Sequence, residues 1–131
     1  MTKFAIIDIE TTGGQYRSGK ITEIAIVLHD GEKVIDQYQT LINPERSIPA
    51  FITGLTGITN EMVSDAPLFC EVAKEIVLRT EGAVFVAHNA RFDYGFLREE
   101  FGRLGYAYTR KQLCTVRLSK KLLPQLKSHS L

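Results

Sequence analysis

The stretch FAIIDIETTGG, at residues 4–14, predicts a buried strand that ends in two acids. Its apolar, β-branched start is typical of a strand covered on both faces, where an uncompensated carboxylate is costly. Asp8 and Glu10 are two residues apart, so their side chains project to one face, with Cα atoms roughly 6.5 Å apart. We expect a cation to neutralise them.

The cation that best suits this pair is Mg²⁺ or Mn²⁺. Both ions prefer oxygen ligands in octahedral geometry and retain positions for water and phosphate oxygens. The alternative is that Asp8 and Glu10 simply end the strand and face water. The Asp-x-Glu pattern alone does not separate the two interpretations.

Length and composition indicate one soluble domain over residues 1–131. Apolar residues make up 44% of the chain and charged residues 24%, which is ordinary for a globular protein. No apolar stretch approaches a membrane span, and the N-terminus lacks a signal-peptide pattern, so we expect a cytoplasmic protein without a membrane partner. Cys70 and Cys114 lack metal-ligand spacing and are expected to be reduced core thiols.

Charge is unevenly distributed along the chain. Residues 109–131 contain six basic residues and no acid, whereas the remainder carries a net charge of −5. A basic segment beside an acidic body could contact phosphates. The alternative is a solvated helix face, which this short cluster favours.

Strand and helix patterns alternate along the chain. Residues 29–32 carry an Asp-Gly turn signal, so the strands on either side form a hairpin, and residues 43–60 are expected to be a long irregular connection. The expected elements are strands from Phe4, at 20–28 and at 33–42, a helix from Pro67, a strand at 83–87, a helix from an N-cap at Asn89 to Leu104, a strand at 113–116 and a helix at 118–123. This order predicts an α/β fold with a mixed five-stranded sheet, three antiparallel strands first and then βαβα, with helices on its faces.

The helix after Asn89 carries an unusual acid, Asp93, on the same face as its apolar side chains. One explanation is the favourable placement of an anion in the first helical turn, worth about 0.3 to 1 kcal/mol. The other is that Asp93 is a third ligand for the metal expected at Asp8 and Glu10.

Three motifs together resemble the DEDD superfamily of 3′→5′ exonucleases. They are DIETTG at 8–13, LTGIT at 55–59 and AHNARFDYGFL at 87–97. The chain is most similar to the DnaQ-like (DEDDh) proofreading-subunit branch, and the similarity extends from Lys3 to Leu131. It implies a ribonuclease-H-like sheet, two divalent cations (Mg²⁺ or Mn²⁺), release of nucleoside monophosphates from DNA or RNA, and a role in DNA replication and repair.

The resemblance also implies roles for individual residues. Asp8 would bridge both ions, Glu10 would hold the ion that orients the attacking water, and Asp93 would bind the other ion, mostly through water. The residues expected to contact the terminal nucleotide are Thr11, Thr12, Gly13, Leu55, Thr56, Gly57, His88, Asn89 and Phe92. For His88, a structural role is the alternative.

The chain departs from the family in one respect. The last motif, a His with an Asp five residues later, should follow a further helix, and the chain ends at Leu131 before it. His129 does not replace it, because no acid follows. We therefore expect the N-terminal portion of an exonuclease domain, lacking the C-terminal helices, with little or no activity by itself.

The expected partners follow from the same resemblance. They are the 3′ end of single-stranded DNA or RNA, a polymerase or fused nuclease domain, and a second copy of the truncated chain. The alternative function is a non-catalytic module with an exonuclease fold that binds nucleic acid or docks on a partner, because function depends on the site and not on the fold.

Overall fold

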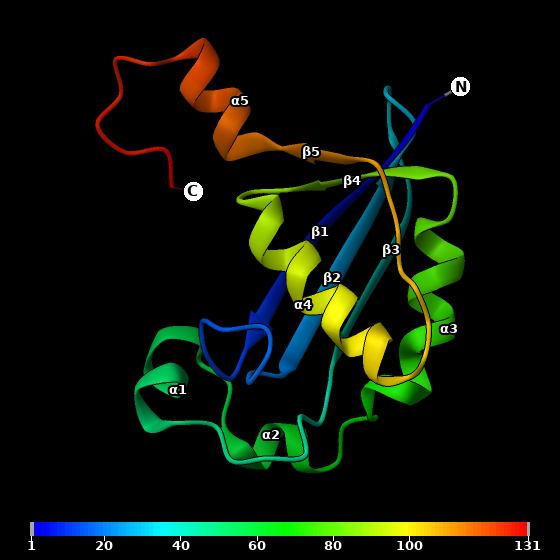
Figure 1. Cartoon of the computed structure of the whole chain (residues 1–131), viewed down its shortest axis with the longest axis vertical. Coiled ribbons are helices and arrows are strands. Elements are labelled where there is room, and N and C mark those ends of the chain that lie inside the picture. The colour runs from blue at the N-terminus through cyan, green and yellow to red at the C-terminus, as the bar shows by residue number, and fades with distance from the viewer. Residues whose placement is uncertain (1, 131) are drawn as a thin grey trace.

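The computed structural model describes residues 2–130, in which a five-stranded sheet carries its helices mainly on one face (Figure 1). The strand β1 (Lys3–Thr11) is central. It pairs antiparallel with β2 (Ile21–His29), and β2 pairs antiparallel with β3 (Val34–Leu41). On its other side β1 pairs in parallel with β4 (Ala83–Ala87), and β4 pairs in parallel with β5 (Gln112–Cys114). The order β3-β2-β1-β4-β5 confirms the mixed five-stranded sheet.

Alternation along β1 determines which face is covered. Ala5, Ile7 and Ile9 are buried, and the helices α3 (Phe69–Thr80) and α4 (Ala90–Arg103) pack against them in one apolar cluster. The opposite face carries Ile6 and Asp8, both exposed. Within residues 2–130, α3 and α4 therefore cover the same face of the sheet rather than one face each.

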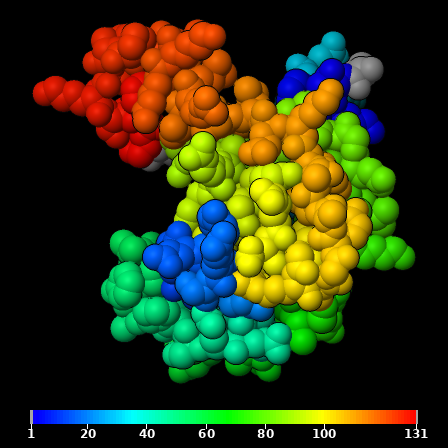
Figure 2. Space-filling view, in the orientation of Figure 1, coloured from blue at the N-terminus to red at the C-terminus, as the bar shows by residue number. Residues whose placement is uncertain are grey.

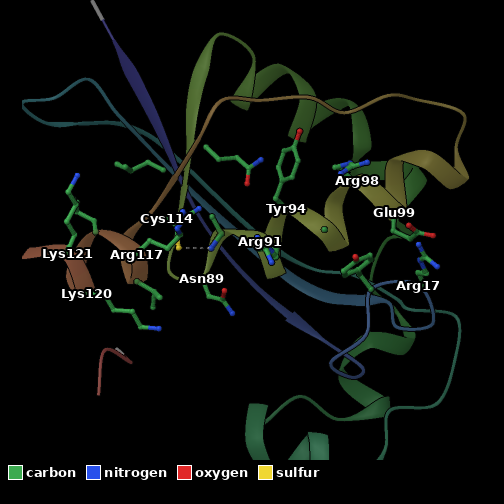
Figure 3. A pocket seen from close by; sticks show the side chains of 17 residues that line it. Arg17, Asn89, Arg91, Tyr94, Arg98, Glu99, Cys114, Arg117, Lys120 and Lys121 are labelled. Atoms are coloured by element: carbon green, nitrogen blue, oxygen red, sulfur yellow. Dashed lines mark hydrogen bonds between the residues drawn. The ribbon is translucent and has the colours of Figure 1, made fainter. Parts of the chain in front are cut away.

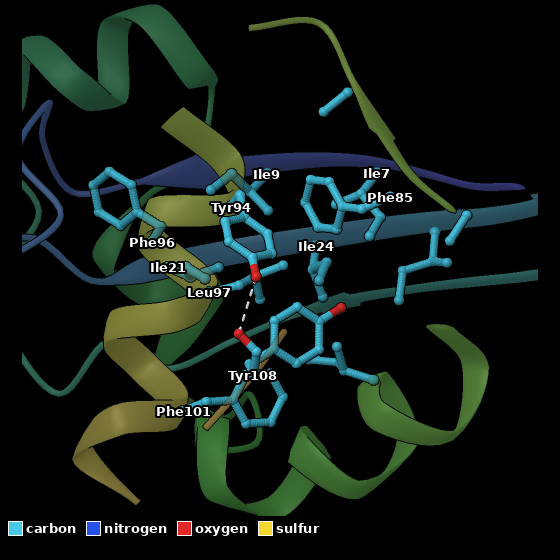
Figure 4. Packing of buried hydrophobic residues seen from close by; sticks show 14 of the residues in the cluster. Ile7, Ile9, Ile21, Ile24, Phe85, Tyr94, Phe96, Leu97, Phe101 and Tyr108 are labelled. Carbon is cyan, nitrogen blue, oxygen red and sulfur yellow. Dashed lines mark hydrogen bonds between the residues drawn. The ribbon is translucent and has the colours of Figure 1, made fainter. Parts of the chain in front are cut away.

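Aromatic side chains fill the space between α4 and the segment that leads to β5 (Figure 4). Phe101 stacks on Tyr108 with ring centroids 4.7 Å apart. The Tyr94 hydroxyl donates a hydrogen bond to the Tyr108 carbonyl at 3.1 Å, and the Tyr108 hydroxyl hydrogen-bonds Thr80 at 2.8 Å. These contacts hold α4 firmly over β1, so the residues of its first turn are well positioned.

The connection after β3 is not irregular, and that prediction is wrong. It contains two short helices, α1 (Ala50–Thr56) and α2 (Asn60–Ser64), which pack on a small separate cluster of Ile48, Ile58 and Val63. The Thr59 hydroxyl accepts the Met62 amide at 3.1 Å and caps α2. Such short helices depend on tertiary packing, which a local pattern does not reveal.

The last element, α5 (Thr115–Leu122), begins earlier than predicted and is set off from the body as a lobe beside α4 (Figure 2). Met1 and Leu131, the ends of the predicted domain, lie outside the described residues. No helix in residues 2–130 is both long and apolar enough to cross a membrane. The core-thiol prediction is wrong, because Cys70 is exposed and Cys114 half-buried, and both are free.

Candidate metal centre and active site

The two acids of β1 lie on the sheet face that α3 and α4 leave open. Asp8 pairs across the sheet with Ala25, and Glu10 pairs with Glu23. Directly paired residues share a face, so Glu23 adds a third carboxylate beside Glu10. The sequence alone does not reveal Glu23, because its position depends on the register between β1 and β2.

The surroundings of Glu10 disfavour its charged form. Partial burial is the largest cause that raises the pKa of Glu10, followed by the negative charges of Asp8 and Glu23. Cross-strand like charges also oppose sheet formation. The end of β1 is therefore an electrostatically costly place that a cation would relieve.

Asp93 lies in the first turn of α4 and is 5% exposed. Burial raises the pKa of Asp93 to about 7, the charges of Asp8 and Glu10 contribute to the rise, and backbone amides of Asp93 and Ile9 oppose it. An acid placed for the helix dipole alone would have a lowered pKa. The rise in the pKa of Asp93 therefore means that burial and the charges of Asp8 and Glu10 outweigh the helix dipole, so the dipole alone does not account for this acid.

The carboxylates of Asp8, Glu10 and Asp93 are suitable ligands for a hard divalent cation, but they do not form a complete coordination site. Within residues 2–130, no three His, Cys, Asp or Glu side chains are gathered closely enough to hold a metal on their own. Electrostatic repulsion reaches further than coordination bonds, so Asp93 still experiences the charges of Asp8 and Glu10. An all-carboxylate donor set suits an ion that also keeps several waters, as Mg²⁺ does.

The two threonines after the acids of β1 shape the backbone. The Thr11 hydroxyl donates to the Gly13 carbonyl at 2.6 Å, and the Thr12 hydroxyl accepts the Lys20 amide at 3.0 Å. Both side chains are buried. They hold the loop between β1 and β2. Of the three residues predicted to contact a nucleotide, only Gly13 is half-exposed, and the contact stays a prediction for each of them.

The predicted contact segment at the end of α1 presents one apolar side chain. Leu55 is 80% exposed, whereas the Thr56 hydroxyl accepts the Ile58 amide at 3.1 Å. Gly57 ends α1 in the left-handed conformation, with φ of 78°. Figure 1 places α1 beside the loop that follows β1.

His88 has a structural environment. One ring nitrogen hydrogen-bonds the Thr115 hydroxyl at 2.7 Å, and the other contacts the His129 carbonyl. His88 and Asp93 share the spacing of the family's last motif, but both ring nitrogens of His88 are engaged. His129 in turn hydrogen-bonds Ser119 of α5 at 2.7 Å. These bonds tie the C-terminal segment to β4 and favour the structural alternative for His88.

Asn89 occupies the N-cap position of α4, as the sequence predicts, but it does not cap the helix through its side chain. Asn89 adopts a left-handed conformation, φ 67° and ψ 60°, and its side chain makes no capping bond to the described residues. The Ala90 amide donates instead to the Cys114 sulfur at 3.4 Å. Phe92 is half-buried and packs on Phe96 with centroids 4.9 Å apart, so part of its ring remains accessible.

A buried acid that the sequence did not single out anchors α4 to the sheet. Glu100 is 2% exposed and accepts the Ile21 amide at 3.1 Å. Its carboxylate also pairs with Lys20 at 3.4 Å and Arg103 at 3.1 Å. Glu100 thereby fixes α4 against the start of β2.

Comparison with known proteins identifies the family of this arrangement. The family model described as "Exonuclease" matches residues 5–131. The chain belongs to the exonuclease family. The predicted DnaQ-like exonuclease resemblance is confirmed.

Relatives of this exonuclease-family chain include much longer proteins. It is 41% identical over 129 residues to the "DNA polymerase III PolC-type" of Caldanaerobacter subterraneus subsp. tengcongensis, covering 98% of the chain and 9% of the relative. It is 40% identical over 131 residues to the "3'-5' exonuclease DinG" of Bacillus subtilis, covering 98% and 14%. The chain thus spans a small part of the curated relatives it matches.

Solved structures show the same architecture. "Exonuclease X in complex with 5' overhanging duplex DNA" is 31% identical with a TM-score of 0.74, covering 98% of this chain and 68% of that one. "Exonuclease I (apo)" has a TM-score of 0.84 at 18% identity, covering 98% and 33%, and supports the fold alone. The predicted ribonuclease-H-like fold is confirmed.

Proposed function

We propose that this chain is a divalent-cation-dependent 3′→5′ exonuclease domain that removes the terminal nucleotide of a DNA or RNA strand. The proposal rests mainly on one observation: Asp93 is buried within reach of the charges of Asp8 and Glu10, and its pKa is raised to about 7. Such a group lowers stability at neutral pH unless a cation compensates it. The 3′→5′ direction is supported by the name of the DinG relatives.

Each residue of the centre has a defined task in this proposal. Asp8 and Glu10 offer carboxylates on the open sheet face, and Asp93 joins them when it loses its proton. When bound, Mg²⁺ or Mn²⁺ would supply charge stabilisation for the attacking and leaving oxygens of a phosphodiester. Leu55 and Phe92, each partly accessible, orient the terminal base and sugar.

The activity of residues 1–131 by themselves is expected to be weak. His88 is engaged with Thr115 and the His129 carbonyl, so the described residues offer no histidine free to act as a general base at this centre. Loss of a general base typically costs a factor of about 10² to 10⁴. The name of the PolC-type relative supports a partner of the polymerase class, and this association is likewise a proposal.

A single-turnover digestion tests the proposed function. The chain, in excess over a 3′-labelled single-stranded oligonucleotide, is incubated with Mn²⁺ or with EDTA, and products are resolved over hours. We expect slow, metal-dependent release of mononucleotides from the 3′ end. Asp8→Asn should abolish the release, and Asp65→Asn, at the exposed end of α2, should leave it unchanged.

Two other results of this digestion would refute parts of the proposal. Binding of the oligonucleotide without any release at stoichiometric enzyme would refute catalysis and favour the non-catalytic binding module. Release that persists in EDTA would refute the requirement for a cation.

A further inference from the structure

A groove with a cavity volume of about 1150 Å³ lies between α4, the loop after β1, and the β5–α5 segment (Figure 3). Among residues 2–130, its lining excludes Asp8, Glu10 and Asp93. The face of α4 that lines it carries Arg91, Tyr94 and Arg98. This face differs from the one that carries Asp93, so the groove is distinct from the acidic centre.

The groove concentrates positive charge from three separate segments. We define the basic groove by six cations in its lining, which are Arg17, Arg91, Arg98, Arg117, Lys120 and Lys121. Glu99 is the single acid among its lining residues in the described chain. Within residues 2–130, none of the six cations forms a salt bridge. The net charge of the whole chain is only +1, so this concentration is local.

Concave surfaces lined by one sign of charge focus the electrostatic potential. Six cations outnumber the single acid of this lining, and none of them is held in a salt bridge within residues 2–130, so the surface can attract a polyanion. A solvated helix face, the alternative raised by the sequence, would involve α5 alone. Arg17 and the two arginines of α4 face the same cavity from other elements, which favours a binding surface.

The lining of the basic groove also includes an aromatic ring, that of Tyr16. Tyr16 is 41% exposed, and its ring packs edge-on against Phe96 with centroids 6.3 Å apart. A Cβ at Gly95 would come within 2.9 Å of the Tyr16 ring, so the glycine lets α4 approach the loop closely. Surfaces that combine cations with accessible aromatic rings are typical of single-stranded nucleic-acid binding.

The floor of the basic groove is also electropositive, where α4 and α5 begin. Cys114 lies there, half-buried, and accepts the Ala90 amide. Burial opposes ionisation of Cys114, but backbone amides of Arg117, Ala90, Asn89 and Val116 outweigh it and lower the pKa of the thiol. The Ala90 amide at the start of α4 therefore adds a positive dipole to the lining of the basic groove.

We propose that the basic groove binds the phosphate backbone of a single nucleic-acid strand whose 3′ end reaches the acidic centre. The destination of the strand rests on the proposed function, whereas binding in the groove does not. Tyr16 would stack on a base, and the arginines and lysines of α4 and α5 would contact successive phosphates.

The two cysteines allow a direct test. Cys114 lies in the basic groove, and Cys70, on α3, is exposed and does not line it. The rates of alkylation of both thiols by N-ethylmaleimide are measured by mass spectrometry in EDTA, with and without a 12-nucleotide single strand. We expect the strand to slow alkylation of Cys114 several-fold and to leave Cys70 unchanged. Equal effects on both thiols, or none on either, would overturn the proposal.

A charge series provides the second measurement. When glutamine replaces both Arg117 and Lys121, the slope of log affinity against log salt should fall by about 0.7 for each phosphate that is no longer neutralised. The matched control neutralises Lys33 and Lys74, which do not line the basic groove. An equal change in both double variants would refute the assignment. Both measurements are made without metal, so failure to cleave DNA would refute the proposed function while leaving this inference testable.

Discussion

Replacing Asp93 with asparagine is expected to stabilise the chain in metal-free buffer at neutral pH. The pKa of Asp93 is raised from 3.8 to about 7, chiefly by burial and then by the charge of Asp8. Well below pH 4 the carboxyl group is protonated in both folded and unfolded states and carries no penalty. As the pH rises from about 4 to 7, the unfolded state ionises first, so the free energy of unfolding falls.

The size of this effect follows from the shift. At about 1.36 kcal/mol per pKa unit, the penalty reaches on the order of 4 kcal/mol above pH 7. Asparagine is nearly isosteric, carries no charge at any pH, and keeps an oxygen that can accept the backbone amides. The variant should therefore avoid the penalty without leaving a cavity.

Urea unfolding in EDTA at several pH values measures the effect. The difference between Asp93→Asn and the parent chain should be near zero at about pH 4 and grow to several kcal/mol by about pH 8. Asp65→Asn, a control on an exposed acid, should show no such growth. A variant that is less stable than the parent at the higher pH, or a difference independent of pH, would refute the electrostatic reasoning.

Two further substitutions test the neighbourhood of the site. Glu23→Gln removes a charge that raises the pKa of Glu10, so carboxyl-carbon NMR titration should show that pKa lowered, and an unchanged titration would contradict the cross-strand contact. Gly19→Ala would place a Cβ 2.9 Å from the Phe96 ring, which should cost about 1 to 3 kcal/mol in urea unfolding. Gly14→Ala meets no atom within 4 Å of its Cβ, and an equal loss in both variants would contradict the close packing at Gly19.

Local patterns predicted most of the sheet. The turn at 29–32 forms because Asp30 accepts the Glu32 and Lys33 amides, both at 2.9 Å, which is a short-range interaction visible in sequence. The strand at 83–87 has the bounds that the sequence predicts. The short helices α1 and α2 and the left-handed Asn89 were missed, because tertiary packing determines them.

The sequence likewise predicts some residues of the candidate site and not others. The period of a strand places Asp8 and Glu10 on one face, which the sequence predicts. The proximity of Asp93 depends on α4 packing against β1, and that of Glu23 depends on strand register. The sequence indicated only a basic segment at 109–131 and favoured a solvated helix face for it. The basic groove was not predicted, because Arg17, Arg91 and Arg98 join it from distant segments.

The most direct test of the central claim is Mn²⁺ binding followed by electron paramagnetic resonance, which detects the free ion. We expect saturable loss of the free-ion signal with the parent chain and with Asp65→Asn at about pH 8, and weaker binding at about pH 6 as Asp93 gains its proton. Binding should be lost in Asp8→Asn and Asp93→Asn. Equal Mn²⁺ binding by the parent chain and both of these variants would contradict the assignment of the acidic centre.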